Sequence, residues 1–188
     1  MRRTMKAQIP TNLEYALLGL LHQQPQSGYD LRKIFAETAM GNYSSSPGAI
    51  YPALKRLETR GLISGEIDDA KELRPRKLFS PTPEGRAIFR YWLRAEISAD
   101  DVSRGLDTLM LRFAFHSLLD DQAASREFLL ALAARLDTYL DELEDQRKMI
   151  PEQVPLQPRL ALDAGIEQTR AAARWAHKAA RQFKEETS

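Results

Sequence analysis

A run of small hydroxyl side chains precedes a segment that should fold as a helix: Ser44, Ser45 and Ser46. Hydroxyl groups and free backbone N–H groups at a helix N-terminus can hold a phosphate without steric hindrance. Gly48 and Ala49 are small enough for the first turn to approach a nucleic acid duplex, and Tyr51 offers a hydroxyl for phosphate or base contact. The alternative is that the serines only cap the helix, as Ser46 should in either case, and that Tyr51 is packed.

A second group of residues with phosphate-binding chemistry follows, four cations within seven residues: Lys71, Arg74, Arg76 and Lys77. Cations that neutralise phosphates release counterions, so such contacts make affinity fall steeply with salt. We expect phosphate contacts from Arg74, Arg76 and Lys77 and assign none to Lys71. The alternative is a solvated hairpin, since three nearby acids reduce the positive field: Asp68, Asp69 and Glu72.

The elements that position these residues follow from capping and periodicity. Thr11 with Glu14, and Ser27 with Asp30, have the spacing of capping boxes that begin helices. The predicted helices cover residues 11–23, 27–42, 46–60 and 82–97, and β-like runs cover 62–67 and 76–80. Three helices, a β-hairpin and a further helix within about 90 residues give the order of a winged helix-turn-helix, a fold that places its third helix in the major groove.

Pro52 breaks the rules of helix formation. A proline inside a helix removes one hydrogen bond and crowds the preceding turn. We therefore hypothesise that Pro47 and Pro52 bend or tighten the first turns, so that Ala49, Tyr51 and Lys55 face the groove. A kink that is merely tolerated on an exposed face is the alternative.

The second half of the chain reads as helices over 106–119, 125–148 and 159–185, with a break at 151–158 that holds three prolines. The two long amphipathic helices predict an antiparallel pair whose remaining apolar edge contacts a second subunit. A monomer whose tail folds back on its own head is the alternative. The predicted interface residues are Leu129, Leu132, Leu136, Leu140, Leu143, Leu162, Ile166 and Ala173.

Composition fits this division. Residues 1–97 hold 15 Lys and Arg and 10 Asp and Glu, a net charge of +5, whereas residues 98–188 hold 12 and 16, a net charge of −4. The positive charge of residues 1–97 favours binding to a polyanion, whereas the negative charge of residues 98–188 is typical of a solvent-exposed surface. The chain has no cysteine, and no apolar run near its start is long enough for a signal peptide or a membrane span. We therefore expect a cytoplasmic protein.

Residues 17–94 resemble the PadR family of bacterial regulators. The matching segments are Leu18–Leu21, Ser27–Leu31, Ser46–Leu54, Arg56–Glu58, Gly61–Ile63, Arg74–Lys77 and Thr82–Arg86. The resemblance implies a homodimer that binds a pseudo-palindromic DNA operator and is released by a small effector. The length of the second half resembles the larger subfamily, whose extended helices embrace the partner. Ser80-Pro81-Thr82 departs from the family's usual apolar residue before the threonine, which leads us to expect a shorter second wing strand.

Catalysis finds little support, because the chain has no glycine-rich phosphate loop and its three histidines are too scattered for a metal motif. We expect neither a cofactor nor a metal. Aromatic candidates for a small aromatic effector, each also explicable as core, are Tyr91, Trp92, Phe113, Phe115, Tyr139 and Trp175.

Taken together, the sequence predicts a mainly α protein. A winged helix-turn-helix DNA-binding domain over 8–97 precedes an antiparallel helical dimerisation domain over 98–188, which also senses any effector. The predicted DNA-contacting residues are Ser44, Ser45, Ser46, Gly48, Ala49, Tyr51, Pro52, Lys55, Arg74, Arg76 and Lys77. The predicted function is that of a ligand-responsive repressor. A winged helix that contacts only proteins is the alternative.

Overall fold

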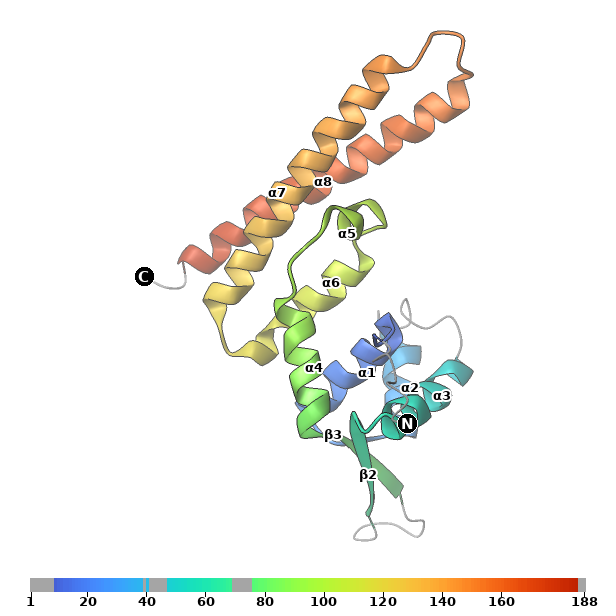
Figure 1. Ribbon diagram of the computed structural model, residues 1–188, viewed down its shortest axis with the longest axis vertical. Coiled ribbons are helices and arrows are strands. Elements are labelled where there is room, and N and C mark those ends of the chain that lie inside the picture. The colour runs from blue at the N-terminus through green and yellow to red at the C-terminus, as the bar shows by residue number, and fades with distance from the viewer. Residues whose placement is uncertain (1–8, 39, 41–46, 69–75, 186–188) are drawn as a thin grey trace, which may run out of the picture. The chain divides into compact units, whose positions relative to one another are not determined.

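The structure, a computed structural model, describes residues 9–38, 40, 47–68 and 76–185 (Figure 1). The chain divides into two compact units, residues 1–92 and 93–188. No helix in the described part of the chain is both long enough and apolar enough to cross a membrane.

Two capped helices begin the first unit. Helix α1 covers Asn12–Gln23 and helix α2 covers Gly28–Glu37. The Glu14 N–H donates to Thr11 Oγ1 at 3.3 Å and the Thr11 N–H donates to Glu14 Oε2 at 3.0 Å, while Ser27 and Asp30 form the same reciprocal pair. Both predicted capping boxes are confirmed. Helix α2 ends before its predicted end, and residues 41 and 42 lie outside the described residues.

The third helix starts later than its predicted beginning. A 3₁₀ turn covers Pro47–Ala49, and the α-helix α3 covers Ile50–Thr59. Pro52 therefore occupies the first α-helical turn, where backbone N–H groups lack intrahelical partners and a proline removes little. The expectation that Pro52 breaks a helix interior is wrong, whereas the tightened first turn is present as a 3₁₀ segment. Gly61 follows the helix with φ +70°, the left-handed conformation that commonly ends a helix.

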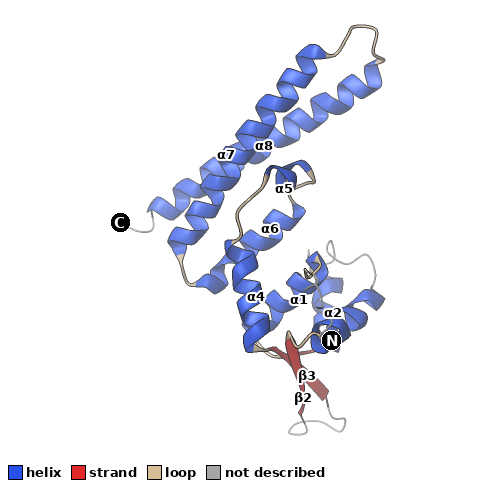
Figure 2. Ribbon diagram, viewed as in Figure 1, coloured by secondary structure: helices blue, strands red, loops and turns tan. Residues whose placement is uncertain are grey.

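The sheet has three antiparallel strands in the order β1-β3-β2 (Figure 2). Strand β1 covers Gln26–Ser27, β2 covers Ile63–Asp68 and β3 covers Arg76–Pro81. The two hairpin strands were predicted, but β1 is too short for a periodic pattern. Strand β3 includes Pro81, which pairs with Ile63, so the predicted shortening is wrong. The missing N–H of Pro81 is tolerated at the strand end, where the Thr82 N–H donates to the Leu62 carbonyl at 3.1 Å.

Helix α4, Pro83–Arg94, follows the hairpin and ends three residues before its predicted end. The core of the first unit takes fully buried side chains from all four helices: Leu17, Leu21, Leu31, Leu54 and Phe89. Trp92 stacks on Tyr15 with ring centroids 4.2 Å apart. Three helices, a β-hairpin wing and a covering helix make this unit a winged helix-turn-helix, as predicted.

The second unit is all helical in its described part. It contains α5 (Ala99–Ser103), α6 (Asp107–Ala114), a 3₁₀ turn (His116–Leu119), α7 (Gln122–Met149) and α8 (Leu156–Glu185). Helix α5 was not predicted, and the expected helix over 106–119 is interrupted after Ala114. Helix α8 begins before Pro158, in contrast to the prediction, because a proline is accepted in a first helical turn.

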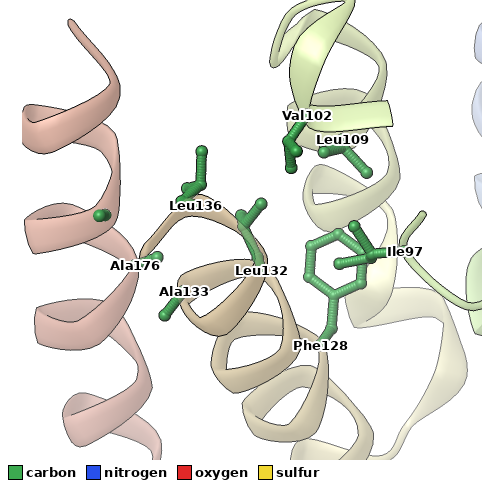
Figure 3. Packing of buried hydrophobic residues seen from close by; sticks show 9 residues of the cluster. Ile97, Val102, Leu109, Phe128, Leu132, Ala133, Leu136 and Ala176 are labelled. Carbon is green, nitrogen blue, oxygen red and sulfur yellow. The ribbon is translucent and has the colours of Figure 1, made fainter. Parts of the chain in front are cut away.

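Helix α7 packs on two sides (Figure 3). Figure 3 shows Leu132 and Phe128 of α7 directed toward Ile97, Val102 and Leu109, while Ala133 lies on the side of Ala176 in α8. Helices α7 and α8 run side by side and antiparallel, as predicted (Figure 1). The apolar residues on these two sides of α7 are therefore buried by other helices of the same chain.

Candidate nucleic-acid interface

Helix α3 has one buried and one exposed face. Ile50, Ala53, Leu54 and Leu57 are buried and hold the helix against the core of the first unit. On the opposite face Tyr51 is 51% exposed, and Pro52 and Lys55 are exposed as well. Three of the predicted DNA-contacting residues thus share an accessible helix face.

Tyr51 lies against the start of α2. A β-carbon built on Gly28 would lie 2.7 Å from Cε1 of Tyr51 and 3.4 Å from Cδ1 of Leu54. Real β-carbons essentially never approach other heavy atoms within 3.0 Å. Gly28 therefore leaves the space in which the Tyr51 ring rests.

A hollow of about 690 Å³ lies where α2, α3 and β3 meet. Its lining residues are Ser27, Gly28, Tyr29, Tyr51, Arg76, Lys77 and Phe79. Tyr29 is exposed and carries the Arg32 guanidinium 5.5 Å from its ring centroid. Two phenols and two cations around one concave surface give hydrogen-bond donors and positive charge suited to a phosphate backbone. We call this surface the α3–wing hollow.

A buried carboxylate fixes the position of α3. Glu14 of α1 is 2% exposed and accepts from Arg56 Nε at 2.7 Å and from Arg60 Nη1 at 3.2 Å. Its Oε2 also accepts the Thr11 N–H. The basic residues of α3 therefore divide into two groups: Arg56 and Arg60 bind Glu14, whereas Lys55 stays on the exposed face.

The wing is tied to α3 through Lys77. Its Nζ lies 2.6 Å from Glu58 Oε1 and 5.2 Å from the centroid of the Phe79 ring. Arg76 stands opposite Asp68 in the hairpin register. The charge of Lys77 is thus shared with an acid of α3, which reduces what it can offer a phosphate.

The other predicted DNA-contacting residues divide into two groups. Gly48 is exposed and Ala49 is half-buried within the 3₁₀ turn. Ser44, Ser45, Ser46 and Arg74 lie outside the described residues, as does Lys71. The site prediction did not include Tyr29 or Gly28, although both belong to the segment Ser27-Gly28-Tyr29-Asp30-Leu31 that helped to carry the family resemblance.

The structure does not gather the candidate effector aromatics into one place. Tyr91 is exposed on α4, and Trp92 and Phe115 are buried in their units. Phe113 and Tyr139 line two separate cavities of the second unit, and Trp175 is partly exposed with its ring edge-on to Phe113 at 5.9 Å. Their role in binding an effector stays a prediction.

The predicted interface residues lie mostly inside the second unit. Leu129, Leu132, Leu136 and Ala173 are buried in its core, Leu143 and Ile166 are also buried, and Leu140 and Leu162 are half-buried. The large apolar side chains that the second unit exposes are Leu130, Met149, Leu156, Leu160 and Trp175. Whether the predicted residues line an interface between subunits stays untested.

The winged helix-turn-helix and its concave, partly cationic α3–wing hollow define a protein of the DNA-binding class by architecture. Comparison with known proteins specifies the family. Residues 17–91 match the family described as "Transcriptional regulator PadR-like family". This match covers the region whose sequence resembles that family.

One similar protein is the "Negative transcriptional regulator PadR" of Bacillus subtilis (strain 168), 29% identical over 144 residues that cover 77% of this chain and 78% of that protein. A crystal structure of Bacillus subtilis PadR in complex with operator DNA is 22% identical, covers 91% of this chain and 98% of that one, and has a TM-score of 0.41. A structure of the same protein in complex with p-coumaric acid is 21% identical and has a TM-score of 0.38. The match covers 92% of this chain and 96% of that chain.

Proposed function

We propose that this protein is a ligand-responsive transcriptional repressor that acts in the cytoplasm and binds a pseudo-palindromic operator as a homodimer. We propose no enzymatic activity for it. The domain over 8–97 binds DNA and the domain over 98–188 joins the two subunits. The similar protein from Bacillus subtilis is a negative transcriptional regulator, which supports repression.

The α3–wing hollow is the observation that carries this proposal. Tyr29, Tyr51, Arg76 and Lys77 line it, and the exposed Lys55 follows Tyr51 by about one turn of α3. An α-helix fits the major groove, and donors on its flank reach the adjacent phosphates. Tyr51 and Lys55 face the duplex, Gly48 and Ala49 allow close approach, and Arg76 contacts the backbone from the wing.

Residues outside the described part complete the proposed contact surface. In the sequence, Ser44, Ser45 and Ser46 precede the 3₁₀ turn that begins at Pro47, and Arg74 stands two residues before the start of β3. We assign phosphate contacts to these four residues, with Pro52 as a positioning residue in the first turn of α3. Lys77 has a weaker role because Glu58 is its ion-pair partner.

DNA binding is tested by capturing fragments of the organism's own genome on the purified chain and sequencing those retained. The proposal predicts enrichment of fragments that share an inverted repeat, with affinity at least about a thousandfold above that for unrelated duplex. Binding to no fragment would favour a winged helix that contacts only proteins.

Self-association uses α7 and α8 in this proposal. The exposed apolar side chains Leu130, Leu156, Leu160 and Trp175 would lie at the subunit contact, with the half-buried Leu140 and Leu162 beneath them. Burial of such surface on association is favourable by about 25 cal/mol per Å² of apolar area. Sedimentation of the purified chain should give the mass of two subunits, and a monomer at micromolar concentration would contradict the dimer.

A further inference from the structure

A cavity of about 480 Å³ opens in the second unit, where α6, the 3₁₀ turn at 116–119, the start of α7 and the end of α8 meet. Its walls include Phe113, His116, Ser117, Asp120, Gln122 and Phe183. Cavities of this size hold small organic ligands in proteins. The DNA-binding proposal does not use this part of the chain.

His116 is a polar side chain with unused hydrogen-bonding capacity. It is 3% exposed, and its Nε2 lies 3.1 Å from the Leu93 carbonyl oxygen, which can only accept. Nε2 therefore carries the proton in the neutral ring, and Nδ1 is left as an acceptor. Among the described residues Nδ1 has no hydrogen-bond partner.

The ring of His116 stays neutral near pH 7. Burial lowers the pKa of His116 to about 4 and outweighs the hydrogen bond to the Leu93 carbonyl, which raises it; the nearby charges of Arg112 and Arg94 lower the pKa further. The ring also lines a second cavity of about 300 Å³, so it stands between two hollow regions. A neutral ring at this position adds no positive charge to the cavity wall near pH 7.

Aromatic rings form the apolar part of the wall. The Phe113 ring is edge-on to the rings of Phe183 and Trp175, with centroid distances of 6.2 Å and 5.9 Å. It is stacked with the Phe128 ring at a centroid distance of 6.0 Å. Aromatic faces bind both planar apolar groups and cations. None of the described side chains that line the cavity is a lysine or an arginine.

Two carboxylates line the cavity, Asp120 and Asp121, and they differ in their hydrogen-bond and ion-pair partners. Asp121 caps α7 by accepting the Ala124 N–H at 3.0 Å and lies 3.3 Å from Arg94 Nη2. Asp120 is exposed with φ +50°, a conformation rare for residues other than glycine, and no hydrogen bond or ion pair to it is seen among the described residues. Asp120 therefore supplies a negative charge that the described part of the chain does not neutralise.

We infer that this cavity binds a small aromatic amine, whose ring lies against Phe113 and Phe183 and whose ammonium group faces Asp120. An aromatic carboxylate of the same shape binds poorly, because it would meet the carboxylate of Asp120. Ligand binding in this cavity is independent of the proposed function. Control of DNA binding by that ligand rests on the proposed function.

Isothermal titration calorimetry of the full chain without DNA tests the site. Phenethylamine and 3-phenylpropionate are the probes, since they share a phenyl ring and a short alkyl chain but differ in charge. We expect phenethylamine to bind at least about tenfold more tightly than 3-phenylpropionate. No heat of binding for phenethylamine, or equal affinity for the two probes, would overturn the inference.

Two variants and one control localise the binding. Asp120→Asn removes the charge and keeps a residue type that tolerates the left-handed conformation, and Phe183→Ala removes one aromatic wall. Each should weaken phenethylamine binding about tenfold or more, while Glu142→Gln, on the exposed surface of α7, leaves it unchanged. Equal affinity in wild type and Asp120→Asn, with thermal unfolding showing both folded, would remove the site whatever the chain does with DNA.

Discussion

Gly28 and Tyr51 fit together only because residue 28 has no side chain: a β-carbon there would lie 2.7 Å from Cε1 of the tyrosine ring. The contact joins the start of α2 to the exposed face of α3. Tyr51 also lines the α3–wing hollow, together with Arg76 and Lys77 of β3. A small change at a buried glycine should therefore alter the exposed surface proposed to bind DNA.

Replacing Gly28 with alanine should weaken DNA binding with little effect on folding. The new methyl group pushes the Tyr51 ring away from its position, which we expect to cost about 1–2 kcal/mol in binding, roughly tenfold in affinity. The free energy of unfolding should change by less than about 1 kcal/mol, because alanine favours the helix. Fluorescence anisotropy with a retained genomic duplex and thermal unfolding measure the two effects.

Gly165→Ala is the matched control, since a β-carbon at Gly165 in α8 would meet nothing within 4 Å. It should leave DNA affinity unchanged and stabilise the chain by about 0.5–1 kcal/mol. Equal DNA affinity in Gly28→Ala and wild type would show that the position of Tyr51 does not matter for binding.

Glu14→Gln should destabilise the first unit. Glutamine keeps the capping-box hydrogen bond but loses the negative charge that binds Arg56 and Arg60. Hydrogen bonds to charged groups contribute about 1.5–3 kcal/mol, and Arg56 is half exposed, so we expect a loss of about 2 kcal/mol in the free energy of unfolding. Urea denaturation followed by circular dichroism gives this value.

The comparison for Glu14 is Asp145→Asn, which removes an exposed ion pair with Lys148. Exposed pairs contribute little, so this variant should lie within about 0.5 kcal/mol of wild type. If the two variants lose equal stability, Glu14 does not hold α3 in the way the geometry indicates.

Acid should destabilise the fold through His116. The unfolded chain protonates this residue near pH 6.5, whereas burial lowers its pKa in the folded chain to about 4. Between these values the unfolded state binds more protons, so stability is fully present above pH 6.5 and falls as the pH drops toward 4. The expected loss from pH 7.5 to pH 5 is about 2 kcal/mol.

His116→Gln isolates this contribution, because its amide can still donate to the Leu93 carbonyl but does not titrate. The pKa of His22 is also lowered, chiefly by burial, and this residue is present in both proteins, so it cancels in the comparison. Urea midpoints at pH 7.5 and 5 should differ less in the variant than in wild type. Identical pH dependence in the two proteins would contradict the low pKa of His116.

Leu136→Asp should unfold the second unit rather than separate two folded subunits. Leu136 is 2% exposed and lies in the core between α5, α6, α7 and α8 (Figure 3). Placing a charge there should cost at least about 4 kcal/mol. Circular dichroism and sedimentation should detect the loss of helix and the loss of the dimer together.

Leu160→Asp is the matched substitution at a side chain that is 54% exposed on α8. It should keep the helical content while weakening self-association, since Leu160 belongs to the proposed subunit contact. A folded Leu136→Asp monomer would instead place Leu136 at the interface predicted from the sequence.

Local signals in the sequence predicted the elements of the first unit well. The capping boxes at Thr11 and Ser27 are set by neighbouring residues, so they could be predicted directly from the sequence. Strand β1 could not, because two residues carry no periodicity and the strand exists only through its pairing with β3. The wrong expectation for Pro52 has a similar cause, since its effect depends on where the helix begins.

The candidate sites were less predictable because they depend on packing between distant segments. Nothing in the sequence shows that Lys77 pairs with Glu58, or that the leucine stripe of α7 is covered by α5, α6 and α8 within the same chain. His116 was dismissed as part of a scattered histidine set, and only the fold shows its unpartnered Nδ1 beside a cavity. Side-chain type located the exposed face of α3, but burial and ion pairing distinguished Lys55 from Arg56 and Arg60.

The salt dependence of duplex binding, measured by fluorescence anisotropy for wild type and Lys55→Ala, tests the central claim most directly. If α3 and the wing bind the phosphate backbone, the logarithm of the association constant should fall linearly with the logarithm of salt concentration. The slope should become shallower by about 1 when Lys55 is removed, because one phosphate contact is lost. Absence of salt-dependent binding to any duplex, or an unchanged slope and affinity in Lys55→Ala, would contradict DNA binding through this face.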